Sequence, residues 1–137
     1  MDHTQFLDDV AKLLGPRGFT QDPELVDPWL TDWRGRYTGR AFGLASPAST
    51  LEVAALVSLC ARHAVPIVPQ GGNSGMSGGA TPDESGEQII LSLRRMNEIR
   101  SFNVDALQIT CDAGVVLQTL HEAVDQAGLR FPLTLGG

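Results

Sequence analysis

The chain has 137 residues, of which 42% are hydrophobic and 19% are charged, a balance typical of one soluble globular domain. This composition excludes a disordered, collagen-like or low-complexity chain. The net charge of −6 at pH 7 argues against a broad surface for nucleic acid or anionic membranes, because such a surface needs clustered lysine and arginine.

The N-terminal segment predicts an amphipathic helix that ends at Gly15-Pro16, with Thr4 as its cap. Its apolar residues recur with the helical period: Phe6, Leu7, Val10, Leu13 and Leu14. Residues 22–40 show no clear period, so we expect an irregular stretch there with a short helical turn near residues 24–26.

A strand–helix–strand unit is predicted next, with strands at residues 41–45 and 65–68 and parallel pairing. Ser49 and Glu52 have the spacing of a capping box, in which each side chain binds a backbone N–H at the start of a helix. The residues expected on the buried face of that helix are Val53, Leu56, Val57, Cys60, Ala61 and Ala64.

The last third of the chain predicts three more strands and a helix. A buried strand is expected at residues 88–93, a weaker one at 99–103, and a half-buried one at 107–113, where apolar and polar residues alternate. A helical face runs from Val116 to Ala127 and is closed by Gly128.

Several classes of site are absent from the sequence. The three histidines are far apart and have no metal-ligand spacing, so no metal site is predicted, and His63 and His121 are expected to lie on solvated helix faces. Cys60 and Cys111 are expected to be buried free thiols. The polar, acidic start does not resemble a signal peptide, and no apolar run reaches the roughly 18 residues of a membrane span, so a cytoplasmic protein is expected.

The most informative segment is the glycine-rich stretch 69–79, which follows the predicted strand at 65–68. Glycine permits positive φ and close approach of a ligand, so several backbone N–H groups can converge on one anion. The segment has no lysine, as a P-loop requires, and no G-x-G-x-x-G opening a helix, as a Rossmann site requires. On composition alone, an anion-binding loop and a flexible surface loop both remain open.

The stretch closely resembles the pyrophosphate-binding loop of FAD-linked oxidases, the family that includes vanillyl-alcohol oxidase. Within that family it is most similar to the branch of D-2-hydroxyglutarate dehydrogenase, D-lactate dehydrogenase and the glycolate oxidase flavin subunit. Further matches occur in the family's order across residues 30–137: Thr31-Asp32-Trp33, Ala45-Ser46-Pro47 with Glu52-Val53, Ile89 to Asn97, Cys111-Asp112-Ala113-Gly114, and Pro132-Leu133-Thr134-Leu135-Gly136.

The resemblance implies an α+β fold, namely the first α/β lobe of a PCMH-type FAD-binding domain and the start of its second lobe. We expect a helical and irregular lead-in at residues 1–40 and an incomplete FAD-binding domain at 41–137. FAD is expected to be noncovalent, because Asn73 and Ser74 stand where some members have a linking histidine. The residues expected to bind FAD are Pro69, Gln70, Gly71, Gly72, Asn73, Ser74, Gly75, Met76, Ser77, Ala113, Gly114, Pro132, Leu133, Leu135 and Gly136.

The implied activity is oxidation of a D-2-hydroxy acid to the 2-oxo acid by hydride transfer to FAD. An electron acceptor is implied as a further partner, and a homo-oligomer is left open. No catalytic residue is nominated here: the base and the metal ligands are expected after Gly137, so the piece alone is expected to be inactive. Two alternatives remain, an FAD-linked oxidase of another alcohol or sugar and a non-catalytic nucleotide- or anion-binding module.

Two further sets of side chains are given structural interpretations. Trp29 and Trp33 are interpreted as packing anchors, because aromatic residues dominate the energetics of protein cores. Arg34, Arg36 and Arg40 are interpreted as solvated charges, because exposed ion pairs contribute little.

Overall fold

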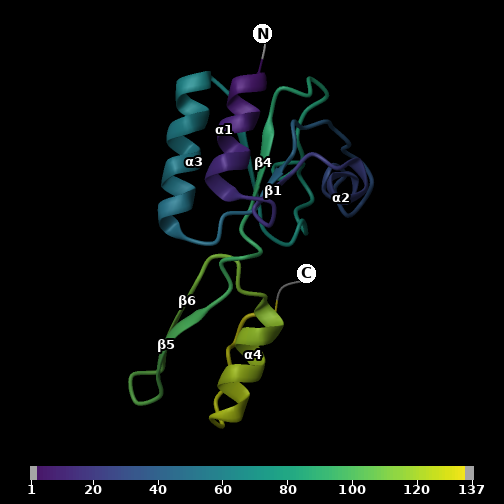
Figure 1. The fold of residues 1–137 in the computed structure, drawn as a ribbon. Helices are drawn as coiled ribbons and strands as arrows, with labels where there is room; N and C mark the ends of the chain where they lie inside the picture. Colours follow the sequence, from purple (N-terminus) through teal and green to yellow (C-terminus); the bar gives the residue numbers. More distant parts are fainter. Residues whose placement is uncertain (1–2, 135–137) are drawn as a thin grey trace.

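The fold, taken from a computed structural model that describes residues 3–134, has two parts that follow one another along the chain (Figure 1). In chain order the elements are α1 (Thr4–Leu14), β1 (Phe19–Thr20), α2 (Pro23–Val26), η1 (Asp27–Trp29), β2 (Leu44–Ala45), α3 (Thr50–His63), β3 (Ile67–Gln70), β4 (Ile89–Ser92), β5 (Ile99–Asn103), β6 (Gln108–Cys111) and α4 (Leu117–Gln126). The elements up to β4 form a first lobe, and β5, β6 and α4 extend away from it as the start of a second.

The first lobe is built on a mixed sheet with strand order β1-β2-β4-β3. Both β2 and β3 pair in parallel with β4, and β1 pairs antiparallel with β2. The predicted parallel arrangement is therefore confirmed, with β4 inserted between the two strands that flank α3. All four residues of β4 are buried, as its central position requires.

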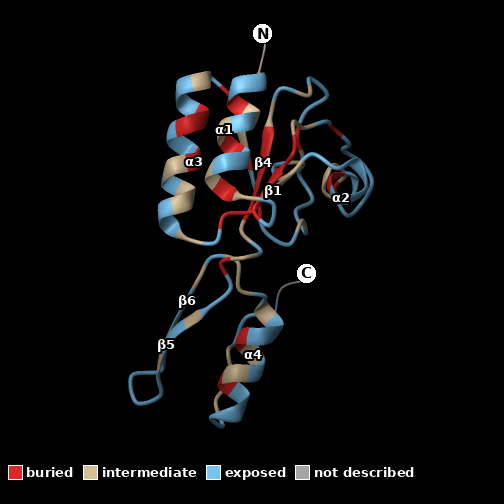
Figure 2. Cartoon of the chain, in the orientation of Figure 1, coloured by how far each residue is buried: buried red, intermediate tan, exposed pale blue. Residues whose placement is uncertain are grey.

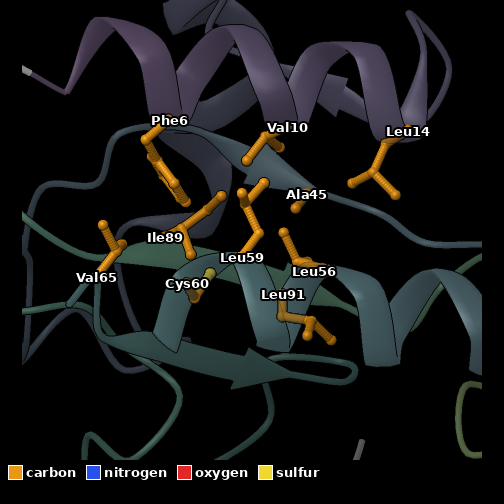
Figure 3. Packing of buried hydrophobic residues seen from close by; sticks show 10 residues of the cluster. All are labelled: Phe6, Val10, Leu14, Ala45, Leu56, Leu59, Cys60, Val65, Ile89 and Leu91. Atoms are coloured by element: carbon orange, nitrogen blue, oxygen red, sulfur yellow. The ribbon is translucent and has the colours of Figure 1, made fainter. Parts of the chain in front are cut away.

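Two hydrophobic clusters cover the two faces of this sheet. On one face, α1 and α3 lie side by side, and Figure 3 shows Phe6, Val10 and Leu14 of α1 pointing toward α3 and the sheet. On the other face, Val26 and its neighbours pack against Ile90. Side chains alternate across a strand, so Ile89 and Leu91 of β4 belong to the first cluster and Ile90 to the second.

The start of α3 confirms the predicted capping box. The Ser49 hydroxyl accepts from the backbone N–H of Glu52 at 3.2 Å. The Glu52 carboxylate accepts from the N–H of Ala48 at 2.6 Å, one residue earlier than the usual partner at the cap itself. The Ser49 bond satisfies an N–H group that a helix start leaves without an intrahelical acceptor, and the Glu52 bond holds the residue before the cap.

Helix details differ from the sequence prediction in three places. Thr4 is the first residue of α1 and His3 occupies the cap position, where no side-chain cap bond forms. Val57 is 44% exposed and Leu59 is 3% exposed, so the buried face of α3 is rotated from the predicted one toward α1. Ala64 adopts a left-handed conformation that ends α3, and both Ala61 and Ala64, which were expected on the buried face, are exposed.

The strand predicted at residues 99–103 is confirmed as β5, whereas the other predicted strands are shorter or displaced. The segment 41–45 contributes two residues to β2, and β3 extends through Pro69 to Gln70, so the strand includes the start of the glycine-rich stretch. The strand predicted at 107–113 spans Gln108–Cys111 only, because Leu107 lies in a left-handed turn.

The second lobe is much more exposed than the first (Figure 2). It consists of the antiparallel hairpin β5–β6 and of α4, on which Leu120 and Val124 are buried. A cavity of about 640 Å³ lies between Phe102 and Ile109 of the hairpin and Val124 and Phe131 of the α4 segment. Cys111 is exposed here, so the prediction of two buried thiols holds for Cys60 alone.

Candidate functional site

The glycine loop, defined as residues 71–79, begins at the carboxyl end of β3. The carboxyl ends of the parallel strands β2 and β4 lie at the same edge of the sheet, and from there the chain passes from β4 into the second lobe (Figure 1). Ligands of open parallel sheets bind outside the carboxyl ends of the strands. The loop is thus at the edge where such a ligand is expected, facing the junction of the two lobes.

The backbone of the loop is available to an external ligand. Within the described part of the chain, no backbone N–H from Gly71 to Ser77 donates to another protein group. A side-chain carbon built at Gly71, Gly72 or Gly75 would meet nothing within 4 Å. A run of free N–H donors bordered by open space fits a phosphate or pyrophosphate, which needs several donors and close approach.

Two residues of the loop have a left-handed backbone. Asn73 has φ 54° and Gly78 has φ 79°, whereas Gly71, Gly72 and Gly75 do not have positive φ. Glycine at positions 71, 72 and 75 therefore serves close approach and not a left-handed turn. Asparagine tolerates the left-handed region better than most residues, which suits position 73.

Gln70 and Asn73 direct their side chains into the protein. Gln70 is 1% exposed, and its Nε2 donates to the carbonyl of Trp29 at 3.0 Å and to that of Ala80 at 2.8 Å. Asn73 Nδ2 donates to the carbonyl of Thr31 at 2.8 Å. The side-chain NH₂ groups of Gln70 and Asn73 therefore bind protein carbonyls and hold the loop in place. At Asn73 the backbone N–H remains available for the predicted contact with the ligand.

Asp32 anchors the segment against which the loop rests. It is 3% exposed, and its carboxylate accepts from the backbone N–H groups of Arg36 at 2.7 Å, Tyr37 at 2.8 Å and Arg34 at 3.3 Å. The bond from Tyr37 is the main cause of the lowered pKa of this carboxyl, which burial opposes. The sequence places Asp32 in the family motif Thr31-Asp32-Trp33 but does not predict these contacts.

Among the cations and aromatic side chains near the loop, Arg34 and Arg36 are exposed as predicted, whereas others differ from the prediction. Trp29 packs on the second cluster as expected, but Trp33 is 61% exposed and is not a packing anchor. The Arg94 guanidinium lies 5.7 Å from the centre of the Trp29 ring. Arg40 donates to the carbonyl of Glu84, so it is not simply solvated. The sequence does not predict the Arg94–Trp29 contact, because only the fold brings the end of β4 next to Trp29.

The remaining predicted ligand residues lie at the joint and in the second lobe. Gly114 packs on the backbone of the turn after β4, which accounts for glycine at this position without a ligand, and Ala113 is exposed. Pro132 and Leu133 are exposed, and the Leu133 carbonyl lies 2.8 Å from Nε2 of His121. Leu135 and Gly136 lie outside the described residues.

Both helix histidines are half-buried, and each contacts another part of the chain. His121 contacts Leu133 as described, and the His63 ring centre lies 5.6 Å from that of Phe6.

Across residues 3–134, no group of three or more histidine, cysteine, aspartate or glutamate side chains could hold a metal ion. Among the helices in that range, none combines the length and the apolar character needed to cross a membrane.

Comparison with known proteins identifies the family. Residues 42–137 match the model of the FAD binding domain. The chain is 38% identical over 131 residues to the D-2-hydroxyglutarate dehydrogenase, mitochondrial, of Bos taurus, covering 94% of this chain and 24% of that protein. It is 35% identical over 112 residues to the D-2-hydroxyglutarate dehydrogenase of Xanthomonas citri pv. viticola, covering 82% of this chain and 23% of that protein.

The fold has a match among solved structures. An alkyldihydroxyacetonephosphate synthase superposes with a TM-score of 0.80 at 20% identity, covering 95% of this chain and 26% of that one. The chain belongs to the FAD binding domain family, and its cofactor is FAD. The α+β fold implied by the glycine-loop resemblance is confirmed.

Proposed function

We propose that this chain is the FAD-binding part of a dehydrogenase that oxidises a D-2-hydroxy acid to the 2-oxo acid. The observation that carries the proposal is the run of backbone N–H groups from Gly71 to Ser77, which have open space and no protein acceptor in residues 3–134. The names of the bovine and Xanthomonas relatives support D-2-hydroxyglutarate as the substrate to test first.

In this proposal the loop holds the pyrophosphate of noncovalent FAD by backbone dipoles. Ser74 and Ser77 add hydroxyl groups, and Met76 is an exposed apolar neighbour. Pro69 directs the chain into the loop from β3. No histidine is present in residues 69–79 to form a covalent link to the flavin.

Bound FAD would supply the redox chemistry, by accepting a hydride from the α-carbon of the hydroxy acid. The residues of this chain bind and orient the cofactor. The chain spans 24% and 23% of the two relatives, and we place the catalytic base and any metal ligands in sequence outside residues 1–137. The electron acceptor and the oligomeric state are properties to be determined on the whole protein.

The first experiment tests the loop with two matched variants of the complete gene product. Gly72→Val should purify without flavin absorbance, because a branched side chain blocks approach of the phosphate. Gly79→Val should keep its flavin, since position 79 has the same open surroundings but lies outside residues 69–77, the part of the stretch predicted to bind FAD. Wild-type flavin content in Gly72→Val would overturn the proposal.

A second measurement addresses the cofactor bond and the substrate. Acid precipitation should release all flavin into the supernatant, because the bond is noncovalent. Reduction of an artificial electron acceptor should be fastest with D-2-hydroxyglutarate and slower with D-lactate or glycolate. Faster turnover of a sugar or an aromatic alcohol would instead assign the protein to another FAD-linked activity.

We also propose a cytoplasmic location for the protein. The bovine relative carries the word mitochondrial in its name, so the two locations are the ones to compare. Fractionation of cells that express the untagged protein should recover it in the cytosolic fraction. Recovery with organelles would contradict the proposal.

A further inference from the structure

The lead-in segment 29–40 runs alongside the segment 70–83, which contains the glycine loop, and the two keep the same direction. At its start the Trp29 carbonyl accepts from Gln70, and two residues later the Thr31 carbonyl accepts from Asn73. At its end the N–H of Arg40 donates to the Asp83 carbonyl at 2.8 Å. The pairs thus follow one another in the same order along both segments.

Two glycines show how closely the segments approach one another. A side-chain carbon at Gly78 would lie 3.1 Å from the Tyr37 ring. One at Gly39 would overlap the Pro82 carbonyl. The lead-in therefore contacts the loop region at its base, its middle and its far end.

Asp32 makes the lead-in rigid enough to act as a support. Its carboxylate gathers three backbone N–H groups of the turn 34–37, and Thr31 and Thr38 pair across that turn with their hydroxyls 3.0 Å apart. Hydrogen bonds to a charged acceptor are stronger than those between neutral groups. The carbonyl of Thr31, which accepts the hydrogen bond from the Asn73 side chain, is thereby fixed in position.

The contact at Asn73 matters because that residue has the left-handed backbone of the loop. A left-handed residue turns the N–H groups on either side of it, and neighbouring N–H groups in such turns form anion-binding concavities. Its side-chain bond to Thr31 holds this conformation in the free protein. Ordering the loop before the ligand arrives reduces the free-energy cost of binding.

We propose that the segment 29–40 is a built-in brace for the glycine loop, and that Asp32 and Asn73 are positioning residues for the FAD pyrophosphate. The inference rests on the proposed function of the loop. It extends the cofactor-binding unit back to Trp29, beyond both the expected boundary at residue 41 and the family match that begins at residue 42.

The test is a double-mutant cycle on FAD affinity in the complete gene product, stripped of flavin and titrated with FAD. Asn73→Gly removes the amide donor and still permits positive φ, and Asp32→Asn removes the charge but keeps the shape. Each should weaken FAD binding about 5- to 10-fold, the range for loss of one hydrogen-bonded contact. The double variant should lose less FAD affinity than the product of the two single fold-losses, because both substitutions act through the Thr31 carbonyl.

The matched control is Asp22→Asn, in which a carboxylate that caps α2 outside the brace is neutralised. It should leave the affinity unchanged and combine additively with Asn73→Gly. Should Asp32→Asn fail to fold by circular dichroism, Tyr37→Ala takes its place, because that side chain is 47% exposed and lies against Gly78 of the loop.

The outcomes separate the two proposals. If Gly72→Val loses FAD but both brace variants bind it as tightly as wild type, the brace is overturned and the loop assignment stands. Additive effects of the two brace variants would also overturn it. If Gly72→Val itself retains FAD, the proposed function of the loop is overturned, and the brace proposal that rests on it is overturned as well.

Discussion

Gly114 lies so close to Leu93 that a side-chain carbon at position 114 would overlap the carbonyl oxygen of Leu93. The N–H of Gly114 also donates to the Met96 carbonyl at 2.9 Å, and that of Asp112 donates to Glu98 at 2.8 Å. These contacts fasten the start of the second lobe to the turn that follows β4. They define the joint between the lobes, at the edge of the sheet where the glycine loop lies.

Substitution Gly114→Ala should destabilise the protein by about 1–3 kcal/mol, the range for overpacking a closely packed site. The added carbon would have to displace backbone atoms, which yield less than side chains. Urea unfolding measures the change. Gly79→Ala is the control, because nothing lies within 4 Å of its added carbon and its φ is not positive. Equal stability of the two variants would contradict the close contact.

Leu56→Ala should destabilise the protein by about 2–5 kcal/mol, since it leaves a cavity in the core. Leu56 is fully buried between α1 and the sheet, as Figure 3 shows. Leu51, on the same helix, is 82% exposed, and Leu51→Ala should change the free energy of unfolding by less than about 0.5 kcal/mol. Thermal or urea unfolding of the pair checks both values, and a similar loss in each would contradict the burial described for α3.

The elements with a clear local signal could be predicted from the sequence. The apolar period of α1, the capping box of α3 and the apolar run of β4 each depend on residues a few positions apart. The glycine loop was also recognisable, because its residues are contiguous. Local patterns are sufficient where neighbours in sequence determine the structure.

The brace could not be predicted, because its contacts join residues about 40 positions apart that share no period. Asn73 binds Thr31 and Gln70 binds Trp29 through backbone carbonyls, which every residue has, so the partners leave no mark in the sequence. The rotation that buries Leu59 instead of Val57 has a similar cause, since the position of α1 decides which face of α3 is covered.

Stability should depend on pH through Asp32. Its pKa in the folded state is lower than the ordinary value of 3.8, so the carboxylate stabilises the fold above that value, and this contribution is lost as the pH falls through the folded-state pKa. Asp32→Asn should therefore be less stable than wild type at pH 7, and the gap should narrow below pH 3.8. Urea unfolding at several pH values measures the gap. The exposed Asp8→Asn serves as the control, and a gap independent of pH would contradict the role of the Asp32 charge.

The two cysteines should differ in reactivity toward a thiol reagent at pH 8. Burial raises the pKa of the Cys60 thiol to about 11, so almost none of it is thiolate at that pH. Cys111 is exposed on β6. In the chain of residues 1–137, one thiol should react rapidly and the second only in denaturant, and Cys111→Ser should remove the fast phase. A fast phase that survives in Cys111→Ser would show that Cys60 is accessible.

Pro69 gives β3 a property that concerns neighbouring molecules. In the described sheet β3 is an edge strand. The carbonyls of Pro66, just before it, and Gln70, its last residue, accept from the N–H groups of Ile89 and Leu93. Backbone groups alternate in direction along a strand, so the missing N–H of Pro69 is one that would have pointed outward. A strand of another molecule that approached this edge would therefore lack one hydrogen-bond donor beside the loop. Proline at such an edge disfavours intermolecular β-pairing. The strand that presents the cofactor loop is thereby protected against edge-to-edge aggregation.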